Sequence, residues 1–416
     1  MTTKKRYTLA IFLLLSSSLF AQTTRNRCNS TSYRAAQIAE NPALAAAYEN
    51  ARLTAAAYAN TPQAALRSVI TIPVVVHIVY KTAAENISDV QVATQLAALN
   101  EDFAGMNADS VRIPSVFKPR FAHPNIQFCL AKRTPAGIAT TGIIRKTTTR
   151  ASFTDDDAVK KANTGGDNAW DASKYLNLWV CNLGTDLLGY AQYPGGLAAT
   201  DGVVIHYKFF GRGGSAEAPY NQGRTGTHEI GHWFGLDHID GDATCGNDNI
   251  ADTPTQNTLN YDCPTFPQIT CNNGPNGDMF MNYMDYVDDA CMQMFTIGQD
   301  AVIEATINTT RQSLQNSLGC LLPTATEQEA FASLNATIQP NPTNAVTTIL
   351  LQATRAEILQ INLYDAVGRL SFSQLTQTTE GRNEIRLDLA HLPSGSYALS
   401  MQTPTQFGSQ KLVIYK

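Results

Sequence analysis

The spacing of hydrophobic residues changes several times along the chain and divides it into segments. Residues 9–20 form one short apolar run near the N-terminus. From residue 69 onward, apolar runs of strand length alternate with segments of helical spacing. After about residue 335, short stretches of alternating apolar and polar residues are separated by turn sequences such as LPSGSY. This pattern predicts an α+β domain followed by a small all-β sandwich, behind an apolar leader.

The first 21 residues have the layout of a secretory signal peptide. Lys4, Lys5 and Arg6 precede the apolar run, which ends near Ala21. The run is too short to span a bilayer, and no other segment is long and apolar enough to do so. We expect cleavage after Ala21, although Leu19 occupies a position where a small residue is usual. The mature protein is therefore expected to be soluble outside the cytoplasm.

Residues 22–67 are rich in alanine and offer little bulk for a core. This segment could be a surface helix of the main domain, or a propeptide that is removed. Because it directly follows the signal peptide, we favour a propeptide, with Arg52 or Arg67 as candidate cleavage sites.

The α+β domain is expected at residues 68–322. Buried strands are predicted at residues 69–80, 175–183 and 201–211, and helices at residues 88–105 and 298–319. The strand at 201–211 is expected to form the sheet edge to which an extended substrate adds as a further strand.

Three of the seven histidines of the chain lie within the stretch THEIGHWFGLDH. On a helix, His228 and His232 lie one turn apart on the same face and can bind one ion. Glu229 can reach a water on that ion, as in the H-E-x-x-H pattern of zinc hydrolases. Gly235 can adopt the left-handed conformation that ends the helix, so that His238 becomes the third ligand.

The extended pattern H-E-x-x-H-x-x-G-x-x-H is specific. A chance match in a chain of this length has a probability on the order of one in a hundred thousand, which argues against a structural helix with idle histidines. Zinc lowers the pKa of a bound water, and Glu229 can accept its proton, so the sequence predicts amide hydrolysis. An adhesin with a structural metal is the competing class, but such a metal needs no general base.

The zinc motif followed by MNYMDY resembles the metzincin metallopeptidases, with Met284 as the Met-turn. Cysteines between and beyond these motifs make the chain similar to the pappalysin family. The resemblance covers about residues 70–320. It implies a metzincin catalytic domain, in which a twisted mixed sheet has backing and active-site helices and the lower subdomain is rich in loops. It also implies two disulfides, Cys245–Cys271 and Cys263–Cys291.

The resemblance assigns further roles. Met284 would form the floor of the metal site, and Tyr286 would stabilise the reaction intermediate. Asp289 would lie under the pocket for the residue after the cut bond, which implies cleavage before Arg or Lys. A metzincin with a different preference, for instance for small apolar residues, is the alternative. We expect a monomer that acts on proteins or peptides.

Family members also bind calcium near the stretch CGNDNIADTP. Its Asp248, Asp252 and Thr253 provide the oxygen donors that calcium prefers. Asn- and Asp-rich turns also occur without ions. We expect a structural calcium here.

Export makes disulfides the default state of the eight cysteines. Related zymogens place a propeptide cysteine on the zinc, and Cys28 is the candidate for such a cysteine switch. The alternative is a disulfide between Cys28 and Cys129, Cys181 or Cys320. The pairing of these three cysteines stays open.

Residues 335–416 follow an apparent linker at residues 323–334. The stretches IQPNP, INLYDAVGRL, LPSGSYALSM and QKLVIYK resemble the sorting domain of the type IX secretion system. This implies export through the periplasm and across the outer membrane by that machinery, to the medium or the cell surface. A carbohydrate- or protein-binding module is the alternative, but the aromatic residues are spaced like core residues. The net charge is −5 and the basic residues form no run, which excludes a nucleic-acid surface.

Overall fold

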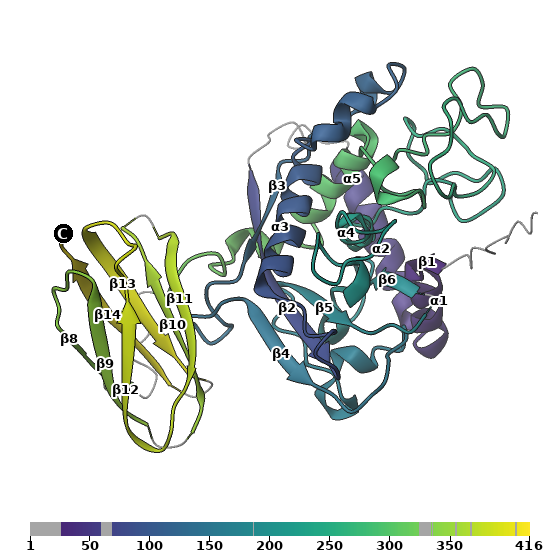
Figure 1. Cartoon of the computed structure of the whole chain (residues 1–416). Coiled ribbons are helices and arrows are strands. Elements are labelled where there is room, and N and C mark those ends of the chain that lie inside the picture. Colours follow the sequence, from purple (N-terminus) through teal and green to yellow (C-terminus); the bar gives the residue numbers. More distant parts are fainter. Residues whose placement is uncertain are drawn as a thin grey trace, which may run out of the picture.

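The computed structural model describes residues 26–59, 69–185, 187–323, 334, 336–353, 356–366, 368–403 and 406–416. They form an α+β body and a separate body made of strands (Figure 1). The predicted signal peptide, residue Arg67 and nearly all of the predicted linker lie outside the described residues. No helix in the described ranges is long and apolar enough to cross a membrane.

The centre of the α+β body is β2 (Ile70–Tyr80), which is buried along most of its length. It pairs in parallel with β3 (Ile126–Leu130) and β4 (Ile143–Thr147) on one side and with β5 (Leu176–Cys181) on the other. β2 and β5 are buried on both faces, as expected for parallel strands that are covered on both sides, whereas β4 is partly exposed.

The sheet continues from β5 to the metal site. β5 pairs in parallel with β7 (Val203–His206), β7 pairs antiparallel with β6 (Leu187–Ala191), and β6 pairs in parallel with β1 (Asn26–Cys28). Among the described residues the order is β1-β6-β7-β5-β2-β3, with β4 also on β2.

The prediction that residues 201–211 form the sheet edge is wrong. β7 lies between two strands and is buried along its whole length, which explains its continuous apolar sequence. The outer strand of the α+β domain proper is β6, and the N-terminal strand β1 occupies its free edge.

Two helices cover one face of the sheet, α3 (Asp89–Phe103) and α4 (Arg224–Trp233). The prediction for residues 88–105 is confirmed, because Ser88 caps α3 by accepting from the Gln91 amide at 3.1 Å. α5 (Ile297–Asn308) begins with a capping box at Thr296. It ends eleven residues before the predicted limit.

The early end of α5 has a local cause. Thr309, a residue of low helix propensity, leaves the helical region of backbone conformation. Arg311 then turns inward, where its guanidinium lies 3.7 Å from the Trp233 ring centroid and 2.6 Å from the Asp201 carboxylate. Single 3₁₀ turns complete the body at Ala108–Arg112, Lys118–Arg120, Ala158–Lys160, Ala162–Thr164, Ala198–Thr200, Tyr207–Phe209, Asp289–Cys291 and Gln312–Asn316.

The N-terminal segment after β1 folds onto this body as α1 (Ser30–Glu40) and α2 (Ala43–Ala59). α2 lies beside α5 (Figure 1). The alanine-rich helices bury few large side chains, among them Tyr33, Leu44 and Tyr48.

Three disulfides are present. Cys245–Cys271 and Cys263–Cys291 hold the irregular region after α4, as the family resemblance implied. The third bond joins Cys129 on β3 to Cys320, and Cys28 and Cys181 are free and buried.

The C-terminal body is an antiparallel β-structure of two sheets. One sheet has the order β11-β10-β13-β14 and the other β12-β9-β8. The strands are β8 (Ala336–Gln339), β9 (Val346–Ala353), β10 (Ile358–Tyr364), β11 (Leu370–Gln377), β12 (Gly381–Asp388), β13 (Gly395–Gln402) and β14 (Phe407–Ile414). Leu and Ile residues from both sheets form one core. The predicted α+β fold followed by an all-β domain is confirmed.

Candidate metal centre

A turn at the end of α4 brings the three histidines together. The helix presents His228 and His232 on one face, and the chain reverses at Gly235, whose φ is +97°. In this conformation the Leu236 amide donates to the Gly231 carbonyl at 3.0 Å. Glycine adopts a positive φ without steric cost, so this position favours it. The turn directs His238 back toward the helix.

The histidine side chains converge through their Nε2 atoms. His232 Nε2 lies 3.1 Å from the Nε2 atoms of both His228 and His238. These atoms and Cys28 Sγ all lie within 4.8 Å of one another, and all four residues are buried. Ligands around a tetrahedral zinc ion lie about 3.3 Å apart, given Zn–N bonds of about 2.0 Å. The arrangement therefore has the dimensions of a zinc site.

Acceptors behind the rings fix the orientation of each histidine. Nδ1 of His228 lies 2.7 Å from the Tyr283 carbonyl, and Nδ1 of His238 lies 2.6 Å from Asp242 Oδ1. Nδ1 of His232 lies 2.7 Å from the Leu236 carbonyl and 2.9 Å from the Tyr193 hydroxyl.

With the proton on Nδ1, each Nε2 is a bare lone pair. Burial lowers the pKa of His228 and His232 well below the usual value, so these rings are neutral. Lone pairs this close repel one another unless a cation lies between them, and thus the donor set fits a metal ion.

Glu229 lies beside the three rings. Its Oε2 accepts from Ser30 Oγ at 2.8 Å and from Cys28 Sγ at 3.3 Å, while its buried Oε1 has no hydrogen-bond partner among the described residues. Burial raises the pKa of this carboxyl to about 7. A Cβ at Gly189 on β6 would lie 3.0 Å from Glu229 Cγ, so a side chain at this position would crowd Glu229.

Met284 and Tyr286 both lie next to the histidine cluster. Met284 is buried under α4, so close that a Cβ at Gly231 would lie 2.4 Å from its Sδ. The Tyr286 hydroxyl lies 3.2 Å from His238 Nε2 and donates to the Cys28 carbonyl at 3.1 Å. Tyr286 can therefore reach an oxygen that replaces the Cys28 backbone.

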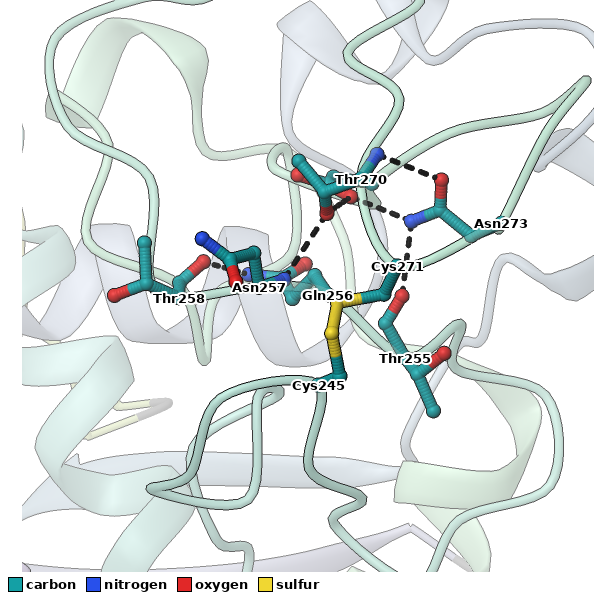
Figure 2. Close-up of a disulfide and its surroundings, with 9 residues drawn as sticks. Cys245, Thr255, Gln256, Asn257, Thr258, Thr270, Cys271 and Asn273 are labelled. Carbon is teal, nitrogen blue, oxygen red and sulfur yellow. Dashed lines mark hydrogen bonds between the residues drawn. A yellow bond between two sulfur atoms is a disulfide. The ribbon is translucent and has the colours of Figure 1, made fainter.

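The irregular region around the Cys245–Cys271 disulfide supports this segment (Figure 2). Asn273 Nδ2 donates to the Thr255 carbonyl at 2.9 Å beside the disulfide. Gln256 Nε2 donates to Asp285 Oδ2, also at 2.9 Å. Asp285 stands between Met284 and Tyr286 in the sequence, so the loop bonds directly to the segment that packs against the histidine cluster.

Asp289 is fully buried and lies next to the start of α4. Its Oδ2 accepts from the amides of Gln222 at 2.8 Å and Arg224 at 3.2 Å. Its Oδ1 lies 3.3 Å from a guanidinium nitrogen of Arg27, the residue before Cys28. Arg27 also lies over the Tyr220 ring, 4.8 Å from its centroid, and bonds the Val287 carbonyl. The N-terminal strand thus places an arginine in a negatively charged pocket.

The three residues expected to bind calcium are not all close together. Thr253 Oγ1 donates to Asp248 Oδ1 at 2.7 Å, and Asp248 Oδ2 is buried without a partner among the described residues. Asp252 instead accepts from Thr296 Oγ1 at 2.7 Å and from the Gly298 amide at 2.9 Å, at the start of α5.

The sequence did not indicate several residues that contact the site. They are Arg27, Ser30, Gly189, Tyr193 and Asp242, and each touches the metal cluster, Glu229 or Asp289. Their partners lie far away in the sequence, apart from Asp242, which is four residues past His238. A carboxylate at this spacing from a ligand histidine was the one available signal.

Comparisons with known proteins agree with this geometry. A peptidase family model described as pregnancy-associated plasma protein-A matches residues 158–308, and one described as a secretion system C-terminal sorting domain matches residues 337–415. An extracellular metalloprotease of the fungus Colletotrichum graminicola is 34% identical over 247 residues, which are 56% of this chain and 75% of that protein. Alignments with other curated fungal extracellular metalloproteases span from 49% to 84% of those proteins.

Two solved structures of Tannerella forsythia proteins are also similar. Mature mirolysin in complex with a cleaved peptide is 51% identical, with a TM-score of 0.60, over 62% of this chain and 100% of that chain. A promirolysin mutant is 46% identical, with a TM-score of 0.66, over 72% of this chain and 99% of that chain.

Proposed function

Because the chain belongs to the pregnancy-associated plasma protein-A (pappalysin) family of metalloproteases, we propose that it is a zinc endopeptidase made as a latent precursor, which cuts before Arg or Lys. It is a secreted metalloprotease with a type IX sorting domain. The observation that carries the proposal is the convergence of three Nε2 lone pairs beside the buried carboxylate of Glu229.

His228, His232 and His238 would hold the zinc, and a water would take the position of Cys28 Sγ in the mature enzyme. When bound, zinc supplies a Lewis acid that makes a water more acidic and polarises a carbonyl. Glu229 accepts the proton of the attacking water, because its Oε1 lies beside the cluster without a hydrogen-bond partner among the described residues. Glu229 then donates that proton to the leaving amine.

Tyr286 is proposed to stabilise the negative charge that develops on the carbonyl oxygen of the substrate. Its hydroxyl donates to the Cys28 carbonyl, which stands here for a carbonyl of a bound polypeptide. A donor already in place for that oxygen favours the tetrahedral intermediate. Met284 supports the histidine cluster from below through its packing against Gly231.

Asp289 is proposed to select the residue after the cut bond. A buried carboxylate that already holds the Arg27 guanidinium favours a basic side chain at this place. A preference for small apolar residues would leave Oδ1 of this buried carboxylate without a cationic partner, which is costly.

Residues 22–67 are proposed to act as the propeptide, with Cys28 as the switch. Cys28 Sγ takes a ligand position in the cluster, Ser30 Oγ donates a hydrogen bond to Glu229, and Arg27 fills the pocket of Asp289. The larger share of this chain that aligns with promirolysin, compared with mature mirolysin, supports a latent form.

Maturation requires a cut between the propeptide and β2. Arg52 lies inside the helix α2 and pairs with Glu49, a conformation that does not fit an extended substrate. We therefore favour a cut at Arg67, the last residue of the predicted propeptide.

We also propose one structural calcium ion, with Asp248 as the central ligand. The unpartnered Oδ2 of this buried carboxylate offers a site for a hard cation. Thr253 is close enough to contribute, whereas Asp252 takes part in the start of α5.

The catalytic domain is proposed to comprise residues 68–322 and the linker residues 323–334. The sorting domain, residues 335–416, would engage the type IX machinery. We propose that the mature enzyme acts as a monomer.

The mechanism is tested by Glu229→Ala in the activated protein, assayed on casein together with its zinc content. We expect one zinc ion per chain and no proteolysis. Glu217→Ala, an exposed glutamate paired with Lys208, is the matched control and should keep activity. A Glu229→Ala enzyme that still cuts casein would disprove the mechanism. If the activated wild-type protein binds the metal but does not cut casein, the result would favour an adhesin with a structural metal.

A further inference from the structure

Tyr33 of α1 lies in a polar site on the face of the sheet opposite α4. Its hydroxyl donates to Asp157 Oδ1 at 2.7 Å and accepts from Lys160 Nζ at 3.1 Å. Tyr33 is 2% exposed, and its ring centroid lies 4.9 Å from that of Tyr190 and 4.7 Å from Lys160 Nζ. We call this the Tyr33 site. Its walls, all from the catalytic domain, are Asp157, Lys160, Trp179, Tyr190, Gln192 and Thr200.

The walls of the Tyr33 site hold one another without help from Tyr33. Lys160 Nζ lies 2.9 Å from Asp157 Oδ1 and donates to the Thr200 carbonyl at 2.8 Å. Thr200 Oγ1 donates to Gln192 Oε1 at 2.7 Å. The site should therefore keep its shape when the propeptide leaves.

The same site has polar capacity beyond this internal network. The Tyr190 hydroxyl is buried and has no hydrogen-bond partner among the described residues. Burial of the Lys160–Asp157 pair costs free energy unless its remaining hydrogen-bonding capacity is used. A site with these properties fits a side chain that is aromatic along its length and polar at its tip.

Its position relative to the metal centre follows from the register of the propeptide. Cys28 pairs with Gly189 on β6, and Tyr190 is the next residue of that strand. Arg27 precedes Cys28 and fills the pocket proposed for the residue after the cut, whereas Tyr33 follows Cys28. The Tyr33 site therefore lies on the side of the metal centre that would hold substrate residues before the cut.

We propose that, after the propeptide has left, the Tyr33 site is a substrate subsite that takes a tyrosine side chain located before the cut bond. The inference rests on the proposed endopeptidase function and adds a second specificity element to it. Tyrosine is favoured over phenylalanine because only the phenol can add hydrogen bonds to Asp157 and Lys160. A subsite built to hydrogen-bond a hydroxyl discriminates against the analogue that lacks it.

The test uses the activated wild-type enzyme and quenched fluorescent peptides with arginine after the cut. Tyrosine and phenylalanine are compared at each position before the cut in turn. We expect kcat/KM to be higher for tyrosine by about tenfold or more at one position, since phenylalanine cannot form the buried hydrogen bonds. Equal rates for tyrosine and phenylalanine at every position would overturn the subsite.

A pair of variants connects the preference to the site. Lys160→Met should bring the tyrosine-to-phenylalanine ratio close to one, and the exposed neighbour Lys161→Met should leave the ratio as in the wild type. A wild-type ratio retained in a folded Lys160→Met enzyme would also overturn the subsite. If Lys160→Met does not fold, the comparison of tyrosine and phenylalanine peptides in the wild type still tests the subsite. Failure to cut any of the peptides would instead refute the proposed protease, so the two failures can be told apart.

Discussion

Exchange of Asp289 for asparagine gives a sharp test of the proposed preference for basic residues. The carboxylate is fully buried, and its Oδ1 lies 3.3 Å from the Arg27 guanidinium, where a substrate arginine would lie in the mature enzyme. Asparagine has the same shape and keeps one oxygen to accept from the amides of Gln222 and Arg224. The change therefore removes the charge with little effect on the wall of the pocket.

The size of the effect follows from the environment of this pair. Loss of one partner of a buried, hydrogen-bonded charge pair costs about 2–3 kcal/mol or more, and about 1.4 kcal/mol corresponds to a factor of ten. We expect kcat/KM for a peptide with arginine after the cut to fall by about 30-fold to 150-fold. A matched peptide with methionine at that position should change by less than about threefold.

The assay compares kcat/KM for the two peptides in the wild type, Asp289→Asn and Asp288→Asn. Asp288 is the adjacent, partly exposed carboxylate and should have little effect in either peptide. If Asp289→Asn slows both peptides by the same factor, the residue only maintains the local structure. That result would refute the assignment of the pocket.

Three further outcomes are expected. Cys28→Ser in the precursor should shorten the lag before casein is cut, because the proposed fourth ligand of the latent metal centre is lost. Cys181 is also free and buried but lies outside the cluster, so Cys181→Ser should leave the lag unchanged. Equal lags in the two variants would exclude the switch. Gly235→Ala should lower the free energy of unfolding by about 1–2 kcal/mol and the zinc content with it, since φ is +97°, and an unchanged melting temperature would contradict this. Burial raises the pKa of Asp248 to about 7, so the unfolded chain releases this proton first as the pH rises, and the calcium-free protein should lose stability between about pH 4 and pH 7. Asp248→Asn or added calcium should flatten that slope in thermal melts, and an identical slope in the variant would rule Asp248 out as its cause.

The histidine cluster was predictable because its geometry is local. His228 and His232 need only the period of a helix, and His238 needs only the turn that Gly235 permits. The residues that complete the centre were not predictable in the same way. Ser30 reaches Glu229 across 199 positions and Tyr193 reaches His232 across 39, and only the folded sheet brings these pairs together.

The fold shows the same division between local and distant information. The apolar runs identified the strands of the sheet, but not their order. Residues 201–211 have a continuous apolar sequence because β7 is internal, while the true edge, β6, has the short sequence LLGYA, which carries no edge signal. The partner of Cys129 lies 191 positions away, and cysteine spacing alone does not identify such a pair.

That third disulfide matters for removal of the sorting domain. Cys320 is fastened to β3, the Lys132 amide donates to the Gly319 carbonyl at 2.7 Å, and Arg133 bonds the carbonyls of Leu321 and Leu322. The last described residues of the protease are therefore attached to the central sheet by a disulfide and by hydrogen bonds. A cut just beyond residue 323 would leave these attachments in place, so the enzyme should keep its stability when the tail is removed.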